Sequence, residues 1–138
     1  MSAWLIDTNV ISEARKRRSG NPGVRAFLQQ ADPVDCYLPV QAIGEIRCGV
    51  ERIRRRGDVA QAGLLETWLE QLVSEYASRI LDFDQACAQA WGGLMALAPG
   101  HPVDAQIAAM AGLHQLTVVT RNTADFAATG VPVHNPFT

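Results

Sequence analysis

Apolar positions along the chain fall into two kinds of pattern, short unbroken runs and longer stretches in which they recur every three or four residues. The short runs are rich in β-branched and aromatic residues and are bounded by polar or breaker residues, which is typical of buried strands. We expect such strands at Ala3–Ile6, Cys36–Leu38, Arg79–Phe83, Leu116–Thr120 and Val131–His134.

The stretches between these runs have helical spacing. One apolar face comprises Ile43, Ile46, Val50 and Ile53 and ends at Gly57. Asp58 is a suitable cap for a long amphipathic helix through Val73, and Asp84 for a later one. We expect further helices from about Asn9 to Lys16, around Val24–Leu28 and from Asp104, with breaks at Ser19–Gly23 and Pro99–Pro102.

Strands that alternate with helices predict an α/β fold, in which a parallel sheet is flanked by helices on both faces. No linker, repeat or low-complexity segment interrupts the pattern, so we expect one domain over residues 1–138. No apolar run reaches the roughly 20 residues that span a bilayer. The N-terminus also lacks the order of a secretory signal, so we expect a cytoplasmic protein without a membrane partner.

Four acidic residues lie where a predicted strand meets a helix. Asp7 and Asp125 follow strands, whereas Glu45 and Asp104 lie early in helices. In parallel sheets the binding crevice lies beyond the carboxyl ends of the strands, so all four side chains are placed to converge there. Carboxylates flanked by apolar residues are costly to bury without compensation, and a shared partner would supply it.

Mg²⁺ or Mn²⁺ is the partner that such oxygen ligands indicate. A bound cation relieves the repulsion among carboxylates, activates water and stabilises charge on a leaving oxygen. Short polar side chains stand beside the acids and are candidates to hold them in place or to bind a coordinated water, namely Thr8, Asn9, Thr120 and Asn122.

Each acidic residue also has a structural explanation. Asp7 and Asp125 are suitable caps, Asp104 lies in a first helical turn that favours an anion, and Glu45 can pair with Arg47 or a neighbouring arginine. Glu45 is the hardest to explain in this way, because it lies between apolar residues of one helix. The three histidines show no metal-ligand spacing, so we expect solvent-exposed or structural roles for His101, His114 and His134. We expect the three cysteines to be buried and apolar in role.

The net charge of −2 conceals an uneven distribution. Residues 1–56 carry ten Lys and Arg against six Asp and Glu, whereas residues 57–138 carry two against eight. Most of the positive charge lies in the basic runs Arg15–Arg18 and Arg52–Arg56. Such runs suit a phosphate backbone, but cations are also favoured at helix C-termini, and the sequence favours neither explanation.

The amino-acid sequences of the motifs resemble those of one family over nearly the whole chain. Leu5–Glu13, Ile43–Val50, Asp104–Ala109 and Val119–Phe126 resemble, in order, the four acidic motifs of PIN domains, and Asn135–Phe137 is similar to a common ending. The most similar subgroup is that of the VapC toxins of bacterial toxin–antitoxin pairs, in the FitB-like branch.

This resemblance implies an endoribonuclease that depends on Mg²⁺ or Mn²⁺ and cleaves RNA phosphodiester bonds with a metal-activated water. It implies catalytic and metal-binding roles for Asp7, Glu45, Asp104 and Asp125, with support from Asn9 and Asn122. It also implies a PIN-like fold, a homodimer, and inhibition by a cognate antitoxin protein that sends an arginine towards the carboxylates.

Two other functions stay open at this stage. The chain is alternatively a non-catalytic PIN-like module that binds a protein partner or nucleic acid. It is also compatible with a PIN nuclease that acts on DNA, although we see no added arch or clamp element for that substrate.

Overall fold

The computed structural model describes residues 2–97 and 100–138 and is built around a five-stranded sheet. The strand order is β3-β2-β1-β4-β5, and every neighbouring pair is parallel. The strands are short, as the apolar runs predict: β1 (Trp4–Ile6), β2 (Cys36–Pro39), β3 (Ile80–Leu81), β4 (Thr117–Val119) and β5 (Val133–His134).

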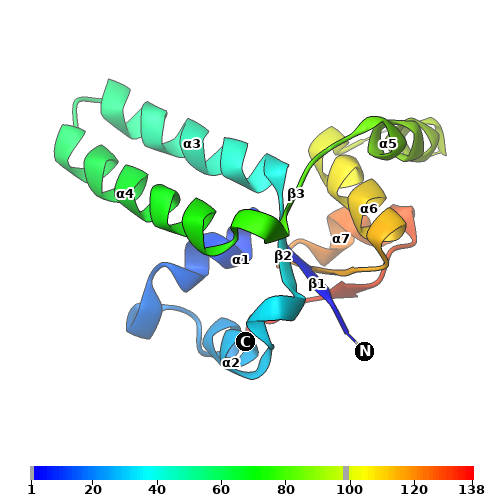
Figure 1. Ribbon diagram of the computed structural model, residues 1–138, viewed down its shortest axis with the longest axis horizontal. Coiled ribbons are helices and arrows are strands. Elements are labelled where there is room, and N and C mark those ends of the chain that lie inside the picture. The colour runs from blue at the N-terminus through cyan, green and yellow to red at the C-terminus, as the bar shows by residue number, and fades with distance from the viewer. Residues whose placement is uncertain (1, 98–99) are drawn as a thin grey trace.

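Helices cover both faces of this sheet, which confirms the predicted α/β architecture (Figure 1). One group lies on one side and comprises α1 (Thr8–Ala14), α2 (Pro22–Gln30), α3 (Val40–Arg55) and α4 (Val59–Glu75). The other group comprises α5 (Gln85–Leu97), α6 (Pro102–His114) and α7 (Thr123–Phe126). Alternate strand residues supply two separate cores, with Ile6 in one and Leu5 in the other, because side chains alternate across a sheet.

Polar caps start several helices where the sequence predicts them. Asp58 accepts a hydrogen bond from the Gln61 amide, and Asp84 accepts one from the Cys87 amide. By contrast, α3 begins directly after the last residue of β2 and has no side-chain cap. Because no loop intervenes, Glu45 lies only one to two turns beyond the carboxyl end of β2.

Two local expectations need correction. The strand expected at Arg79–Phe83 contains only Ile80 and Leu81, because Arg79 ends a 3₁₀ turn and donates to the carbonyls of Pro33 and Cys36. Cys48 is exposed on α3, whereas Cys36 and Cys87 are buried as expected. In the turn expected at Pro99–Pro102, Pro99 lies outside the described residues. None of the helices in the described part of the chain is long and apolar enough to cross a membrane.

Candidate metal centre

Asp7 is the most firmly held of the four predicted carboxylates. It directly follows β1, and its side chain is buried with 5% exposure. Its Oδ1 accepts the Thr8 amide at 2.8 Å, and its Oδ2 accepts the Thr120 hydroxyl at 2.9 Å and the Asn9 amide nitrogen Nδ2 at 3.3 Å. Asp7 is therefore the cap of α1, as its position suggests, but it also has one oxygen held by side chains from β1–α1 and from the end of β4.

Glu45 is exposed on α3 and is linked to Asp7 through Thr8. The Thr8 hydroxyl donates to Glu45 Oε1 at 2.9 Å, while the Thr8 amide donates to Asp7. The alternative pairing of Glu45 with Arg47 is wrong, because Arg47 turns towards Glu51 and Glu66 instead. Glu45 is thus left facing the carboxylates.

Asp104 lies in the first turn of α6 and is partly buried. Burial is the main factor that raises its pKa from 3.8 to about 6, and the negative charges of Asp7, Asp125 and Glu45 add to the effect. His101 acts in the opposite direction and lowers this pKa. Because one carboxyl group is influenced by all three others, the structure brings the four predicted residues into one electrostatic cluster, here called the carboxylate cluster.

Asp125 completes the carboxylate cluster from α7. Its backbone amide donates to the Asn122 carbonyl at 3.0 Å, and its Oδ1 lies 3.3 Å from Nε2 of His101. The charge of Asp125 also raises the pKa of Asp7, although burial is the larger cause there and the hydrogen bonds from Thr120, Thr8 and Asn9 oppose it. The two strand-following acids therefore interact across the neighbouring strands β1 and β4.

His101 is the residue that sequence reasoning missed. We expected a solvent-exposed or structural role, but ligand atoms of His101, Asp104 and Asp125 lie within 4.8 Å of one another. The side chain is 64% exposed, so the expectation of solvent exposure is confirmed, and the proximity to two carboxylates was not predicted. The available signal was the spacing of His101 and Asp104, three residues apart at the start of a helix, which places both at the same end of α6.

Three of the four supporting residues contact the carboxylate cluster. Thr8 bonds Glu45 and Asp7, and both Asn9 and Thr120 bond Asp7 and each other. Asn122 differs, because it takes part through its backbone amide, which donates to the Thr120 hydroxyl at 3.0 Å. Its exposed side chain makes no hydrogen bond within residues 2–97 and 100–138.

The donor set fits a hard divalent cation. No lysine or arginine within the described ranges forms an ion pair with the carboxylate cluster, and only His101 contacts it as a possible positive charge. Carboxylates whose pKa is raised by burial and by one another are stabilised by a cation placed among them. Oxygen ligands of this kind suit Mg²⁺ and Mn²⁺.

The basic runs lie at helix ends, as expected. Arg52, Arg54 and Arg55 are in the last turn of α3, and Arg54 is paired with Glu51 and Glu66. In the other run Lys16 bonds Glu13 at 3.0 Å, and the guanidinium of Arg15 lies 5.9 Å from the Trp68 ring centroid. Part of each run is therefore engaged within the chain, while Arg17, Arg18, Arg52, Arg55 and Arg56 are exposed.

Comparison with known proteins shows the family to which the chain belongs. The chain is 37% identical over 139 residues to "Toxin FitB" of Neisseria gonorrhoeae, with 96% of this chain and 97% of that protein covered. It is 30% identical over 142 residues to "VapC ribonuclease Y4jK" of Sinorhizobium fredii, with 96% of each covered. Its fold is similar to the crystal structure of FitAcB from Neisseria gonorrhoeae, with a TM-score of 0.87, 36% identity, and 96% and 97% of the chains covered. Residues 4–131 match the PIN domain, and the chain therefore belongs to the PIN domain family.

Proposed function

We propose that this protein is a cytoplasmic endoribonuclease dependent on Mg²⁺ or Mn²⁺ and the toxin of a type II, VapBC-like toxin–antitoxin pair. The observation that carries the proposal is the carboxylate cluster, which lies at the carboxyl ends of β1 and β4 without a lysine or arginine partner among the described residues. The similarity to proteins named as a FitB toxin and a VapC ribonuclease supports the same assignment.

Asp7, Glu45, Asp104 and Asp125 are the residues that would hold the cation. When bound, the cation would supply Lewis-acid activation of water and charge stabilisation at the scissile phosphate. The protein's own contribution is positional. Thr120 and Asn9 hold one oxygen of Asp7, and Thr8 orients Glu45 towards it, so that the ligands need little reorganisation on binding.

The RNA substrate must approach a site of negative charge. The exposed arginines of the two basic runs are positively charged and would neutralise phosphates of the bound strand. Arg121 is a further candidate, because it directly follows Thr120 and its guanidinium lies 5.0 Å from the Phe137 ring centroid. A phosphate backbone bound by these cations would be held beside the cluster rather than repelled from it.

An antitoxin is the protein partner that we propose. A cavity of about 310 Å³ between α1, α2 and α4 is lined largely by apolar side chains, including Val10, Leu28 and Leu72, with Arg15 and Glu75 at its edge. None of the carboxylate cluster lines this cavity. An apolar cavity with a few charged groups at its edge suits an apolar segment of a second protein, which would then continue towards the cluster.

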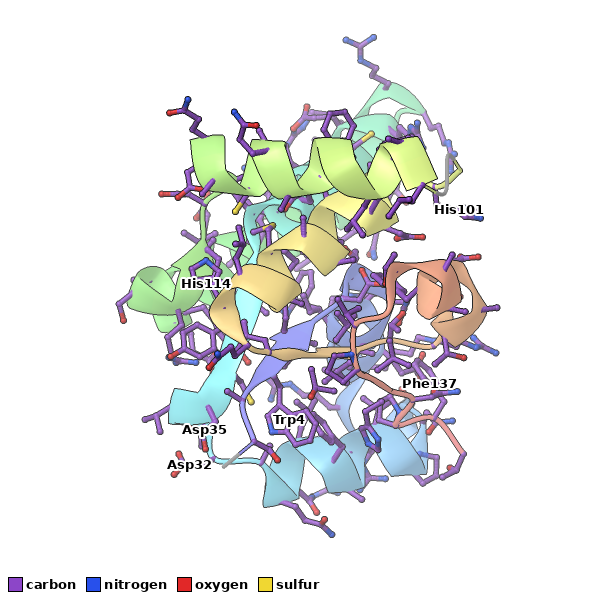
Figure 2. All side chains as sticks on the ribbon, turned by 90° about the vertical axis from the view of Figure 1, so that its right-hand side faces the viewer. Trp4, Asp32, Asp35, His101, His114 and Phe137 are labelled. Atoms are coloured by element: carbon purple, nitrogen blue, oxygen red, sulfur yellow. The ribbon has the colours of Figure 1, made fainter. Side chains whose placement is uncertain are left out.

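A homodimer is also part of the proposal. The thirteen residues of α5 contain no charged side chain, and Leu97 at its end is 86% exposed. Figure 2 shows α5 along one edge of the molecule, and none of the other described helices or strands covers its outer side in this view. An uncharged surface helix of this kind favours burial against a second copy. Size-exclusion chromatography with light scattering tests this, and a monomer at micromolar concentration would contradict it.

The decisive experiment is cleavage of a total RNA pool by purified protein with Mg²⁺, with Mn²⁺ and with EDTA. The Asp104→Asn variant is compared with Glu70→Gln, which removes one exposed carboxylate on α4 away from the cluster. We expect discrete fragments that require metal, disappear in Asp104→Asn and persist in Glu70→Gln. Cleavage that survives EDTA or Asp104→Asn would overturn the assignment.

Two further outcomes identify the alternatives. If no sample cleaves RNA, mass analysis for a co-purified small protein separates inhibition by a retained antitoxin from a module that only binds. Cleavage of a matched DNA oligonucleotide in preference to RNA would assign the protein as a DNA-directed nuclease.

A further inference from the structure

His101 occupies a position that its role in the helix does not explain. It is the residue before the first turn of α6, but its side chain makes no capping hydrogen bond to the helix backbone. Its Nε2 lies 3.3 Å from Asp125 Oδ1 instead, and one ligand atom each of His101, Asp104 and Asp125 lies within 4.8 Å of the others. One imidazole nitrogen therefore contacts the Asp125 carboxylate and lies near that of Asp104.

The backbone around His101 is restrained. Pro102 follows it at the first position of α6, and a residue before proline is limited to extended conformations, in agreement with its φ of −66° and ψ of 92°. The indole N–H of Trp91 on α5 donates to the Pro102 carbonyl at 3.1 Å, which ties the start of α6 to the neighbouring helix. The backbone that carries the imidazole is therefore restrained, and the contact of His101 Nε2 with Asp125 Oδ1 places this 64% exposed side chain beside the carboxylates.

There is also room for a ligand beside it. A cavity of about 160 Å³ is lined by His101 and Asp125 together with apolar groups that include Leu94 and Ala105. At roughly 30 Å³ per water, this volume accommodates several water molecules. An ion at the edge of this cavity would keep water or substrate oxygens as its remaining ligands.

The chemistry of the donors separates two cations that otherwise behave alike. Mg²⁺ binds carboxylates, phosphates and water and seldom uses nitrogen, whereas imidazole is a common ligand of first-row transition metals. The order of affinities places Mn²⁺ lowest among those metals, so its preference for an added nitrogen is modest. A surface ion pair between His101 and Asp125 would explain their contact but not the proximity of Asp104 to both residues.

We propose that His101 is a nitrogen ligand of the cation held by Asp104 and Asp125, and that it gives the site a preference for Mn²⁺ over Mg²⁺. The inference rests on the proposed metal-dependent function but adds a ligand that the four acidic motifs do not contain. A site made only of carboxylates would bind both Mg²⁺ and Mn²⁺. With His101 as a ligand, the site of this chain should bind Mn²⁺ more tightly than Mg²⁺.

The test measures binding of the metal alone, without RNA. Mn²⁺ and Mg²⁺ are titrated by calorimetry into the wild type, His101→Ala, His114→Ala and Asp104→Asn. His114 is the matched control, because it is an exposed histidine at the opposite end of α6 (Figure 2). Pulsed electron paramagnetic resonance of the Mn²⁺ complexes then reports directly whether a ¹⁴N nucleus is bound to the ion.

We expect His101→Ala to weaken Mn²⁺ binding by about ten-fold and Mg²⁺ binding by less than about two-fold, and to remove the ¹⁴N signal. His114→Ala should behave as the wild type. Loss of Mn²⁺ binding in Asp104→Asn together with an unchanged Mn²⁺-to-Mg²⁺ ratio in His101→Ala would overturn this inference alone. Failure of the wild type to bind either ion would overturn the metal-dependent function as well.

Discussion

Two clusters of charged side chains share helix α3 and differ in how their charges are balanced. Glu45 belongs to the carboxylate cluster, whereas Arg47, Glu51 and Arg54 form an arginine–glutamate network with Glu66 of α4. In the network Arg47 lies 3.2 Å from Glu51, and Arg54 lies 3.0 Å from Glu66. Each of its acids contacts both arginines, so the network is neutral and complete within the chain.

The pKa shifts of the two groups have opposite directions. Hydrogen bonds from Arg54 and Arg47 lower the pKa of Glu51, and Arg47 is the main cause of a lowered pKa at Glu66. Burial and neighbouring carboxylates raise the pKa of Asp7 and Asp104. Charged carboxylates thus stabilise the arginine–glutamate network, whereas in the carboxylate cluster their charge is unfavourable. Carboxylates that the chain does not neutralise are those for which a ligand is expected.

The largest difference between the two clusters should be in activity. Asp7→Asn keeps a side-chain oxygen to cap α1 but removes a charged metal ligand, so we expect loss of RNA cleavage by more than about 100-fold with the fold retained. Glu66→Gln, in the arginine–glutamate network, should cleave within about two-fold of the wild type. Initial rates under identical Mn²⁺ concentrations check this, and equal losses in both variants would remove the distinction between the clusters.

Loss of the Thr8 hydroxyl should have a smaller effect on the same reaction. Thr8→Val preserves shape but removes the donor to Glu45 Oε1, so we expect about a ten-fold loss in cleavage and weaker Mn²⁺ binding. Thr8→Ser supplies the hydroxyl again and should recover most of the activity. If Thr8→Val and Thr8→Ser have the same activity, Thr8 does not orient Glu45.

Stability of the metal-free protein should change in opposite directions at pH 7. Asp104→Asn removes a negative charge from a repulsive cluster and should raise the free energy of unfolding. Glu66→Gln removes a partner from two arginines and should lower it slightly, with less effect at high salt. Urea denaturation in EDTA measures both changes. Destabilisation by Asp104→Asn would contradict our inference that the charge of Asp104 is unfavourable in the metal-free cluster.

The pH dependence of these stability changes should be the subtlest difference. The folded-state pKa of Asp104 is about 6 against an ordinary value of 3.8, so its unfavourable contribution appears as pH rises through this window. The stabilisation by Asp104→Asn should therefore be full above pH 6 and vanish below about pH 4. The pKa of Glu66 is lowered from 4.5, so its stabilising contribution is present above pH 4.5 and is lost only at more acidic pH.

Urea denaturation of the wild type and the two variants between pH 3 and pH 7 follows both dependences. A stabilisation by Asp104→Asn that stays constant across this range would show that Asp104 titrates at its ordinary pKa.

Much of the fold was predictable because short-range patterns specify it. The apolar runs of β1, β2 and β4 alternate with helical periods, and Asp58 and Asp84 act as caps where their positions suggest. The prediction was wrong where a long-range contact overrides local preference. Arg79, for example, donates to the carbonyl of Pro33 and to that of Cys36 at the start of β2, and the strand expected at its position is shortened.

The sequence by itself determined that four acidic residues follow or accompany strand ends, because strand and helix periods are local properties of the chain. Only the tertiary structure decided which side chains contact these acidic residues. The contacts of Thr120 with Asp7 and of His101 with Asp125 join residues 113 and 24 positions apart, and Arg47 turns away from nearby Glu45 towards α4. No local pattern encodes these choices, because they depend on which elements pack together and on where each remaining charge finds a partner.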